Sequence, residues 1–509
     1  MSEPDFLEVG AQFQLGMLDT ERPHPKTKNL SSWARSDLSR AIQVLKEVDQ
    51  DALALFEGRI DKLEGLAVAI RQTLDRGDKV FLCGCGATGR LSISLEIFAR
   101  GGLLKGATDN NVIGFMAGGD AALIRSIERF EDRPDFGERQ LLELGFSNGD
   151  LLISSTEGGE TPFVIGATEA AAKVSVEPPY FLYCNPDREL REHVERSRAV
   201  LDNQSVRKVN LAVGPMALSG STRMQASTVL MAAIGFAMQR NPAGLKESFQ
   251  YWQNWALKEV DWNFLAAFIE AESQAYQKGE YLTYDPGPYG ITILTDTTER
   301  SPTFTLTPFE RNGEGEKPSL CYLRIPEAQS AEAAWLDLLG RNPRPLEWGE
   351  LKHLTNAEAL AKFDFSRHNQ VARDRRLNKA PQRCFRFSRD KADIVWAFGG
   401  LDARIPVPGE MDSLGENLLI KMLLNVHSTL VMGRLGRYAG NVMTYVSANN
   451  FKLIDRSIRY VMEILETQHG VSKAYNDVAM QLVKEKQRLQ PDEPIVLRTV
   501  EAILKKNDA

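Results

Sequence analysis

The sequence predicts an α/β protein with two successive parallel-sheet units and a helical segment at its C-terminal end. A chain of 509 residues is too long for a single hydrophobic core, so two or three domains are expected. From residue 79 onward, short apolar runs alternate with helix-length stretches, which is typical of parallel strands joined by crossover helices. From Gly415 the helical periodicity continues without further strand candidates.

The elements divide the chain into four predicted segments. Residues 1–45 are expected to form a proline-punctuated arm and a helix. The first α/β unit, residues 46–250, contains five apolar strand candidates, KVFLC, NVIGFM, DLLISS, PYFLYC and VNLAV, which fit a sheet covered on both faces. The second unit, residues 251–414, contains EYLTY, SLCYLRI, CFRFS and DIVWAF. Residues 415–509 are expected to form a helical segment and a small cap.

Composition and charge exclude several classes of protein. With 43% hydrophobic and 25% charged residues, the chain is neither disordered nor collagenous. Its 61 basic and 68 acidic side chains give a formal charge of −7, and no Lys/Arg block could follow a nucleic-acid backbone. The longest apolar run, Val229 to Met238, is too short to span a membrane, and MSEPDFLEVG lacks a signal-peptide core. The five cysteines form no disulfide framework, which indicates a reducing compartment. Together, these observations predict a cytoplasmic protein without nucleic-acid or membrane partners.

A glycine-rich loop, GCGATGR, follows the first strand and leads into the helix LSISLEIFA. Backbone N–H groups and the positive end of a helix can approach an anion in such a turn, and a threonine adds a hydroxyl donor. We therefore predict a phosphate cradle that contains Gly84, Gly86, Thr88 and Gly89. The loop also fits the dinucleotide pattern G-x-G-x-x-G, but the acidic residue that should follow about 20 positions later is missing, since Asp120 lies too far along. A tight turn without a ligand is the remaining alternative.

Two further loops at strand ends carry small and hydroxyl-bearing residues. DLLISS leads into TEGGETP, in which the candidate binding residues are Thr156, Glu157, Gly158, Gly159 and Thr161. VNLAV is followed by GSTRM, in which Ser221 and Arg223 are candidates. Arg223 could bind a phosphate or a carboxylate, and packing in a surface turn is the equal alternative. Loops at the carboxyl ends of parallel strands suit a phosphorylated small molecule better than a dinucleotide.

These motifs occur in the order found in sugar isomerase (SIS) domain proteins. The shared segments are GCGATGR, AGGD at 117–120, the acidic group Glu128, Glu131 and Asp132, TEGGETPFVIGA and GSTRM. The chain resembles the branch that holds bacterial N-acetylmuramic acid 6-phosphate etherases and animal glucokinase regulatory proteins. LDTERPHPKTKNL and the run 433–453 also resemble the etherases, so the resemblance covers nearly the whole chain. It implies tandem SIS-type domains, flavodoxin-like and doubly wound, with a helical cap as in the regulatory protein, whereas etherases carry one SIS domain per chain and dimerise.

The resemblance also implies a chemistry with two glutamates. One removes the proton next to the aldehyde of the ring-opened sugar, and the other assists departure of the lactyl oxygen. Glu131 matches one of them, whereas the first unit has Phe98 at the other position and Glu96 on the wrong helical face. Glu299, in the second-unit segment TDTTERSPTF, matches the missing glutamate. Because the second-unit loop 285–290 lacks the phosphate pattern, we predict one composite site per chain.

Both glutamates have plainer interpretations, and so does a buried-looking lysine. Glu299 could be a solvated loop carboxylate, and Glu131 part of an acidic helix face. Lys421, in the apolar run LLIKMLLNVHST, resembles the family lysine that reaches the sugar phosphate, with a snorkelling lysine as the alternative. His427 is expected to fill a helix interface. Six scattered histidines without a ligand cluster support neither a metal nor a cofactor.

The predicted function is a lyase that cleaves the lactyl ether of N-acetylmuramic acid 6-phosphate or a related amino-sugar phosphate. Glu131 and Glu299 favour this reading. A non-catalytic sugar-phosphate sensor with a sugar kinase as partner is the first alternative, favoured by Phe98 and by Asp120, where etherases carry a longer acid. An aldose–ketose isomerase is the second alternative, for which the sequence offers no separate His/Glu signature.

Overall fold

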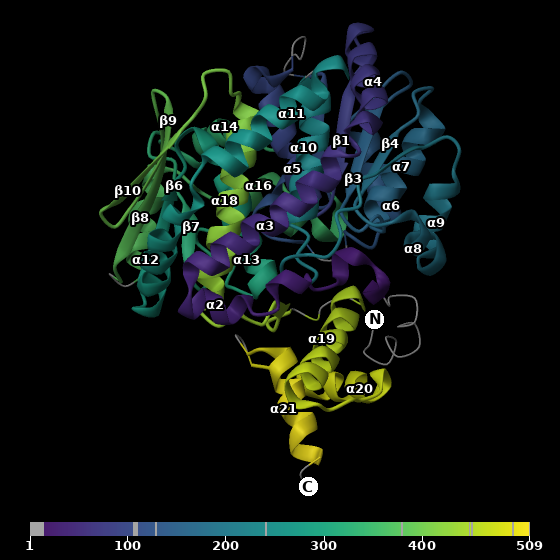
Figure 1. Cartoon of the computed structure of the whole chain (residues 1–509). Helices are drawn as coiled ribbons and strands as arrows, with labels where there is room; N and C mark the ends of the chain where they lie inside the picture. Colours follow the sequence, from purple (N-terminus) through teal and green to yellow (C-terminus); the bar gives the residue numbers. More distant parts are fainter. Residues whose placement is uncertain are drawn as a thin grey trace.

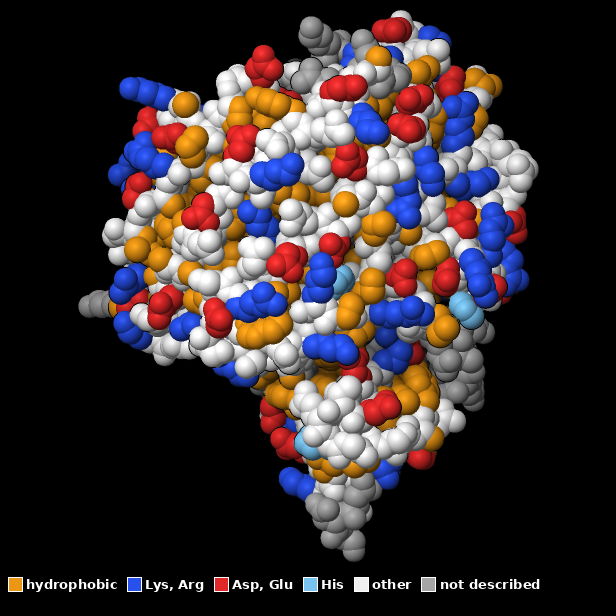
Figure 2. All heavy atoms as spheres, in the orientation of Figure 1, with side chains coloured by type: hydrophobic (Ala, Val, Ile, Leu, Met, Phe, Trp, Pro, Cys, Tyr) orange, Lys and Arg blue, Asp and Glu red, His pale blue; other side chains and the backbone are white. Residues whose placement is uncertain are grey.

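Two five-stranded sheets flank a central layer of helices in the computed structural model, which confirms the predicted α/β class (Figure 1). The structure describes residues 15–104, 110–127, 130–239, 242–377, 380–446, 448, 451–490 and 493–507. Within these ranges, no helix combines the length and hydropathy needed to cross a bilayer. Acidic and basic side chains are interspersed on the face that Figure 2 shows.

The first sheet is entirely parallel and has the strand order β2-β1-β3-β4-β5, which is the flavodoxin-like order that was predicted. Its strands are β1 (Val80–Gly84), β2 (Val112–Met116), β3 (Leu151–Thr156), β4 (Tyr180–Tyr183) and β5 (Arg207–Asn210). Each falls on a predicted apolar run, although β5 begins and ends earlier than VNLAV. Successive side chains of β1 enter different hydrophobic clusters on the two faces, as the pleat requires: Val80 and Leu82 in one, Phe81 and Cys83 in the other.

Helices cover both faces of this sheet. One face packs against α3 (Leu38–Glu57), α4 (Glu64–Asp75), α5 (Ala87–Phe98) and α10 (Gln225–Gln239). The other face packs against α6 (Pro134–Glu143), α7 (Pro162–Val174), α8 (Asp187–His193) and α9 (Glu195–Asp202). The buried strands are apolar on both sides for this reason.

The second sheet is mixed, with the order β10-β9-β8-β6-β7. Only β6 makes parallel pairs, with β7 and β8, whereas β8, β9 and β10 form an antiparallel meander. The strands are β6 (Tyr281–Asp285), β7 (Cys321–Leu323), β8 (Gln382–Asp390), β9 (Asp393–Phe398) and β10 (Leu401–Pro406). Gly399 and Gly400, both at positive φ, form the tight turn between β9 and β10. Sequence analysis missed β10, because LDARIP is half-exposed and carries no apolar run.

The central layer joins the two halves. Its longest helix, α18 (Ser413–Arg434), is buried from Leu414 to Gly433 apart from one position and packs against α10 of the first half and α13 (Gly290–Phe304) of the second. One hydrophobic cluster runs continuously from β1 in the first half to Trp396 in the second. The helix thus lies between the sheets, away from the helices that follow it. The predicted four-segment division of the chain remains a prediction.

The remaining helices surround this frame. They are α2 (Leu30–Ser36), α11 (Leu245–Asn254), α12 (Leu265–Gln277), α14 (Ala331–Leu339), α15 (Lys352–Thr355), α16 (Ala357–Ala361) and α17 (Arg367–Arg376). A separate group projects below the main body in Figure 1 and consists of α19 (Phe451–His469), α20 (Tyr475–Lys486) and α21 (Ile495–Asn507). The N-terminal arm is bound to this cap, since Glu21 pairs with Arg456 at 2.6 Å and with Arg459 at 3.1 Å.

Candidate active site

The candidate site lies where the strand order of the first sheet reverses. β1 pairs with β2 on one side and with β3 on the other, so the order in which strands are added to the sheet reverses at β1. Ligands of such sheets bind at the carboxyl ends of the strands at this point. GCGATGR follows β1 and TEGGETP follows β3. Two of the three predicted binding loops are therefore neighbours at this switch point.

The glycines of the first loop serve two different purposes. A Cβ on Gly84 would lie 2.3 Å from the carbonyl carbon of Thr88, and one on Gly89 would lie 2.4 Å from the Cβ of Met116. These two glycines allow close packing of strand and helix. Gly86 has a φ of +57° and open space where a Cβ would stand, directly before α5. It leaves the positive end of α5 uncovered, as an anion site requires.

Thr88 stabilises the loop from within. Its hydroxyl donates to the Cys85 carbonyl at 2.9 Å and accepts from the Cys85 N–H at 3.0 Å. The second loop has a similar internal bond, because the hydroxyl oxygens of Thr156 and Thr161 lie 3.0 Å apart. The Gly159 N–H donates to Thr156 at 3.3 Å. The predicted threonines thus shape both loops, in addition to any contact with a ligand.

Two glutamates of the second loop have opposite electrostatic environments. Burial, assisted by the nearby carboxylates of Glu299 and Glu131, raises the pKa of Glu157 to about 7. Glu160 is equally buried, but Lys452 at 2.7 Å and Arg196 lower its pKa to about 2 against the effect of burial. Only Glu160 is therefore held as a carboxylate by direct ion pairs.

Lys452, from α19 of the cap, connects this loop to Glu131. Its Nζ lies 3.6 Å from a carboxylate oxygen of Glu131, whose side chain is 37% exposed. Sequence analysis did not single out Lys452, although the residue lies in the etherase-like run 433–453. The run itself was the signal that could have identified it.

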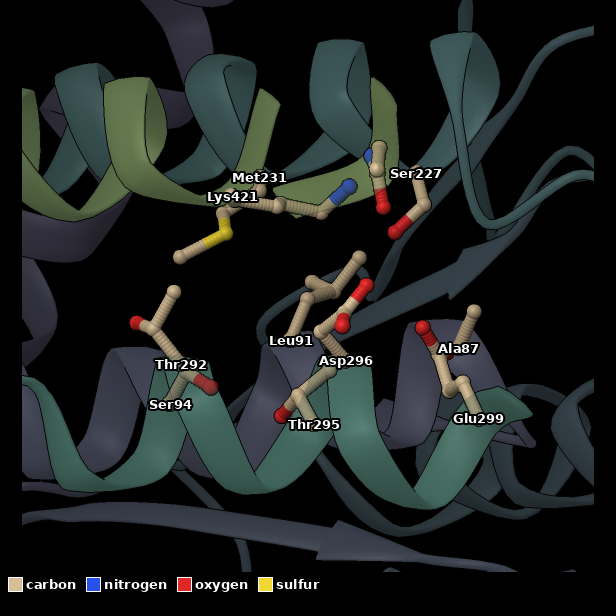
Figure 3. Close-up of a pocket in the computed structure, with 11 residues that line it drawn as sticks. Ala87, Leu91, Ser94, Ser227, Met231, Thr292, Thr295, Asp296, Glu299 and Lys421 are labelled. Atoms are coloured by element: carbon tan, nitrogen blue, oxygen red, sulfur yellow. The ribbon is translucent and has the colours of Figure 1, made fainter. Parts of the chain in front are cut away.

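A cavity beside the first loop brings the two halves of the chain together. Figure 3 shows Thr292, Asp296 and Glu299 on α13, opposite Lys421 of α18 and Ser227 of α10. Ala87, Leu91 and Ser94 of α5 complete one side. Ala87 is the first residue of α5, so the cavity adjoins the glycine loop.

Glu299 and Lys421 are both buried in this cavity. Glu299 is 6% exposed on α13, so it is not a solvated loop carboxylate. Burial raises its pKa, while the positive charges of Arg90, Arg223 and Lys421 oppose that shift. Lys421 does not snorkel, because its Nζ donates to the Arg223 carbonyl at 2.8 Å and to the Thr228 hydroxyl at 2.9 Å. Burial lowers the pKa of Lys421 to about 8 even though Glu299 favours the charged form.

Arg223 is bound to the protein. Its two terminal nitrogens donate to Asp296 at 3.2 Å, to Asn425 at 3.3 Å, and to the hydroxyls of Ser428 and Thr429. This buried network connects the third loop to α13 and α18, so Arg223 does not pack in a surface turn. Ser221 is 5% exposed, and its hydroxyl has no hydrogen-bond partner in the described part of the chain.

Other sequence candidates lie away from the cavity. Glu96 is fully buried between Arg100, Arg341 and Arg344, and Asp120 is paired with Arg341 at 2.6 Å. Glu128 lies outside the described residues. His427 is buried against the rings of Phe385 and Trp396 and lies 3.5 Å from Glu272.

The loop after β6 has no cradle like that after β1. A Cβ on Gly287 would lie 2.4 Å from the Phe387 carbonyl oxygen, and Tyr289 is buried with its hydroxyl donating to Glu416 at 2.7 Å. Among the residues that the structure describes, no three His, Cys, Asp or Glu side chains converge in a way that could hold a metal ion.

Comparison with known proteins agrees with this geometry. Residues 64–172 match the family described as the glucokinase regulatory protein N-terminal SIS domain. The chain is 31% identical over 221 residues to the N-acetylmuramic acid 6-phosphate etherase of Rippkaea orientalis, a match that covers 43% of this chain and 66% of that protein. N-acetylmuramic acid 6-phosphate etherase 1 of Bacillus licheniformis is 29% identical over 217 residues, or 42% of this chain and 65% of the relative.

The matched region thus spans just under two thirds of the length of these curated relatives. Among solved structures, the tagatose-6-phosphate ketose/aldose isomerase of Escherichia coli is 10% identical with a TM-score of 0.43. That alignment covers 78% of this chain and 94% of the isomerase.

Proposed function

We propose that this chain is a sugar-phosphate lyase of the SIS domain family, in the branch of the N-acetylmuramic acid 6-phosphate etherases and glucokinase regulatory proteins that it matches. Its substrate is N-acetylmuramic acid 6-phosphate or a related amino-sugar phosphate, and the bond cleaved is the lactyl ether. One observation carries the proposal. Glu299 from the second half lies in the same cavity as Lys421 and the start of α5, which follows the glycine loop.

The geometry supports a division of roles between two glutamates. The sugar phosphate is held at the positive end of α5 and the glycine loop, with Lys421 as the nearby cation. Glu131 removes the proton on the carbon next to the aldehyde of the open sugar. The electron pair of the broken C–H bond then forms a C=C double bond in the sugar, while the ether C–O bond breaks and its electron pair leaves with the lactate oxygen. Glu299, whose burial favours the protonated form, gives its proton to the departing lactate oxygen.

The test is release of D-lactate from N-acetylmuramic acid 6-phosphate. Because general acid–base assistance contributes about 10² to 10⁴ in rate, Glu131→Gln and Glu299→Gln should each lower lactate release by about that factor. Binding of the sugar phosphate should persist, since the amides retain shape and much of the hydrogen bonding. Glu169→Gln, on the partly exposed side of α7, is the matched control and should leave the rate unchanged. A wild-type protein that binds the sugar phosphate and releases no lactate would eliminate the lyase.

In that case a sensor is the second candidate. Phe98 occupies the position at which the family carries a glutamate in the first half, and it is buried. The matched family model is that of a regulatory protein. A sensor should bind a sugar kinase in a manner that depends on sugar phosphate, which co-sedimentation with and without the ligand measures.

A further inference from the structure

Glu157 is a buried carboxyl group at the switch point to which the proposed chemistry gives no task. It follows β3 directly and is 8% exposed. Its Oε1 is inaccessible to solvent and has no hydrogen-bond partner in the described part of the chain. A buried carboxylate oxygen without a partner is costly, so the side chain must either hold a proton or meet a group that arrives with the ligand.

The groups around Glu157 come from every neighbouring element. Glu131 and Glu299, the two proposed catalytic glutamates, both interact electrostatically with it. The cations within reach are Lys452 of α19 and Lys421 of α18. The thiols in reach are Cys85 and Cys184, and burial raises the pKa of both, so they are neutral.

Neither cation is bonded to Glu157. Lys452 pairs with Glu160 and Glu131, and the Nζ of Lys421 donates to the Arg223 carbonyl and to Thr228. Among the described residues no ion pair to Glu157 is found, and the carboxyl groups of Glu131 and Glu299 both interact with it electrostatically. Neighbouring carboxyl groups oppose each other's ionisation, so a buried one without a cation holds its proton more tightly.

We propose that Glu157 is a third carboxyl group of the composite site, which contacts the bound sugar in its protonated form and takes up a proton when the sugar phosphate binds. This inference rests on the sugar-phosphate binding proposed above, and it holds for the lyase and for the sensor alike. A protonated carboxyl can donate a hydrogen bond to a hydroxyl or carbonyl oxygen of the sugar. An ionised one would repel the phosphate dianion that occupies the adjoining loop.

The pH dependence of binding follows from the proposed link between sugar-phosphate binding and protonation of Glu157. In the free protein the pKa of Glu157 is about 7, so below that pH the group is already protonated and affinity should be independent of its titration. Above pH 7, binding has to bring in a proton. Affinity should then fall by up to about tenfold for each further pH unit until the pKa of the complex is passed.

The experiment is calorimetric titration of the full chain with N-acetylmuramic acid 6-phosphate at about pH 8, in two buffers with different ionisation enthalpies. Wild-type protein should take up a proton at Glu157 in addition to any taken up by Lys421, whose pKa is about 8 and which lies beside the proposed phosphate position. Glu157→Gln should take up fewer protons than the wild type, by as much as one for each sugar bound. It should bind at pH 8 at least as tightly as the wild type, because the amide is always neutral and can still donate. The second phosphate ionisation, near pH 6, is common to both proteins and cancels. Glu169→Gln is the control and should behave as the wild type.

Equal proton uptake by wild type and Glu157→Gln would overturn the proposal. A second measurement does not depend on the variant folding. With ¹³C-carboxyl glutamate, which leaves the aspartates unlabelled, one resonance should titrate near neutral pH in the free protein and at higher pH in the complex. A complex in which all glutamates are ionised at pH 7 would also contradict the inference. If the protein does not bind the sugar phosphate at all, the titration should instead give no heat of binding at any pH.

Discussion

At the scale of single residues, burial has opposite consequences for carboxyl groups that have a cation and those that do not. Glu160 and Glu21 are buried beside Lys and Arg side chains, and the pKa of each is lowered to about 2. Asp49 is buried with no ion pair among the described residues, accepts a hydrogen bond from the Gln225 side chain at 2.6 Å, and has its pKa raised to about 7. A neighbouring cation, and not the degree of burial, decides whether the fold stabilises the ionised or the protonated carboxyl group.

Asp49 gives a prediction about pH and stability. Because its folded pKa lies above its unfolded value of 3.8, its contribution is fully present below that value and is lost as pH rises towards 7. The loss should reach up to about 4 kcal/mol of unfolding free energy. Urea unfolding of the wild type and of Asp49→Asn between about pH 4 and 8 measures it. The variant should show a smaller decline, and parallel profiles would contradict the assignment.

Thr88 tests the role of a loop hydroxyl. Thr88→Val removes both bonds to Cys85 and should cost about 1 to 3 kcal/mol of stability together with weaker sugar-phosphate binding. Thr88→Ser keeps the hydroxyl and should retain most of both. Thermal unfolding with and without the sugar phosphate separates the two effects. Equal behaviour of the two variants would show that the hydroxyl is dispensable.

The resemblance to SIS proteins pointed to Glu299 and Lys421, and the loop at a strand end pointed to Thr156. Glu299 and Lys421 lie in the cavity and Thr156 at the switch point, while their roles stay predictions. The partners of Arg223 were not predictable, since Asp296 and Ser428 are 73 and 205 residues away in the chain. No periodicity encodes such a contact.

At the scale of elements, the turn between β1 and α5 contains one glycine that is needed for close packing, Gly84, and one that is needed for its backbone conformation, Gly86. Gly84→Ala should destabilise strongly, because its Cβ would overlap the Thr88 backbone, which cannot move without shifting the helix. Gly86→Ala meets open space and should cost about 1 to 3 kcal/mol for its strained backbone, with φ +57° and ψ −121°. Melting temperatures of the two variants test this order. Gly86→Ala as the more damaging change would show that the ranking is wrong.

Strands were predictable where both faces are covered. The first four runs of the first sheet become parallel strands that are buried along their whole length, whereas β5, at the edge, carries Arg207, Lys208 and Asn210 and is buried only at Val209. The antiparallel direction of β9 is not recorded in its composition, but the connection of only two residues between β8 and β9 requires it. The short turn at Gly399 and Gly400 was the available signal for a hairpin.

At the scale of the whole molecule, an arginine clamp fastens the second half to the first. Arg341 and Arg344 bind the buried carboxylate of Glu96, and Arg341 also binds Asp120. Glu96 therefore has a structural role. Sequence analysis predicted only that it lies on the wrong face of its helix for catalysis and assigned it no role. The composite site predicted that the halves associate, but the arginine contacts were not predictable from sequence, since they join positions more than 200 residues apart.

Removal of the charge of Glu96 should weaken the whole protein. Glu96→Gln leaves buried arginines uncompensated and should cost about 3 to 5 kcal/mol. Glu64→Gln, on the exposed start of α4, should cost little and is the control. Calorimetric unfolding measures both. A loss of lactate release without a loss of stability would instead assign Glu96 to the chemistry.

The composite cavity takes its residues from both halves of one polypeptide, and this has a consequence for how the protein responds to dilution. Where two separate chains have to meet to complete a site, the fraction of working sites falls once the concentration drops below the dissociation constant. Here the second half is tethered to the first, so its effective concentration is fixed by the fold. Turnover per chain should therefore stay constant down to the lowest concentration at which the protein can be assayed.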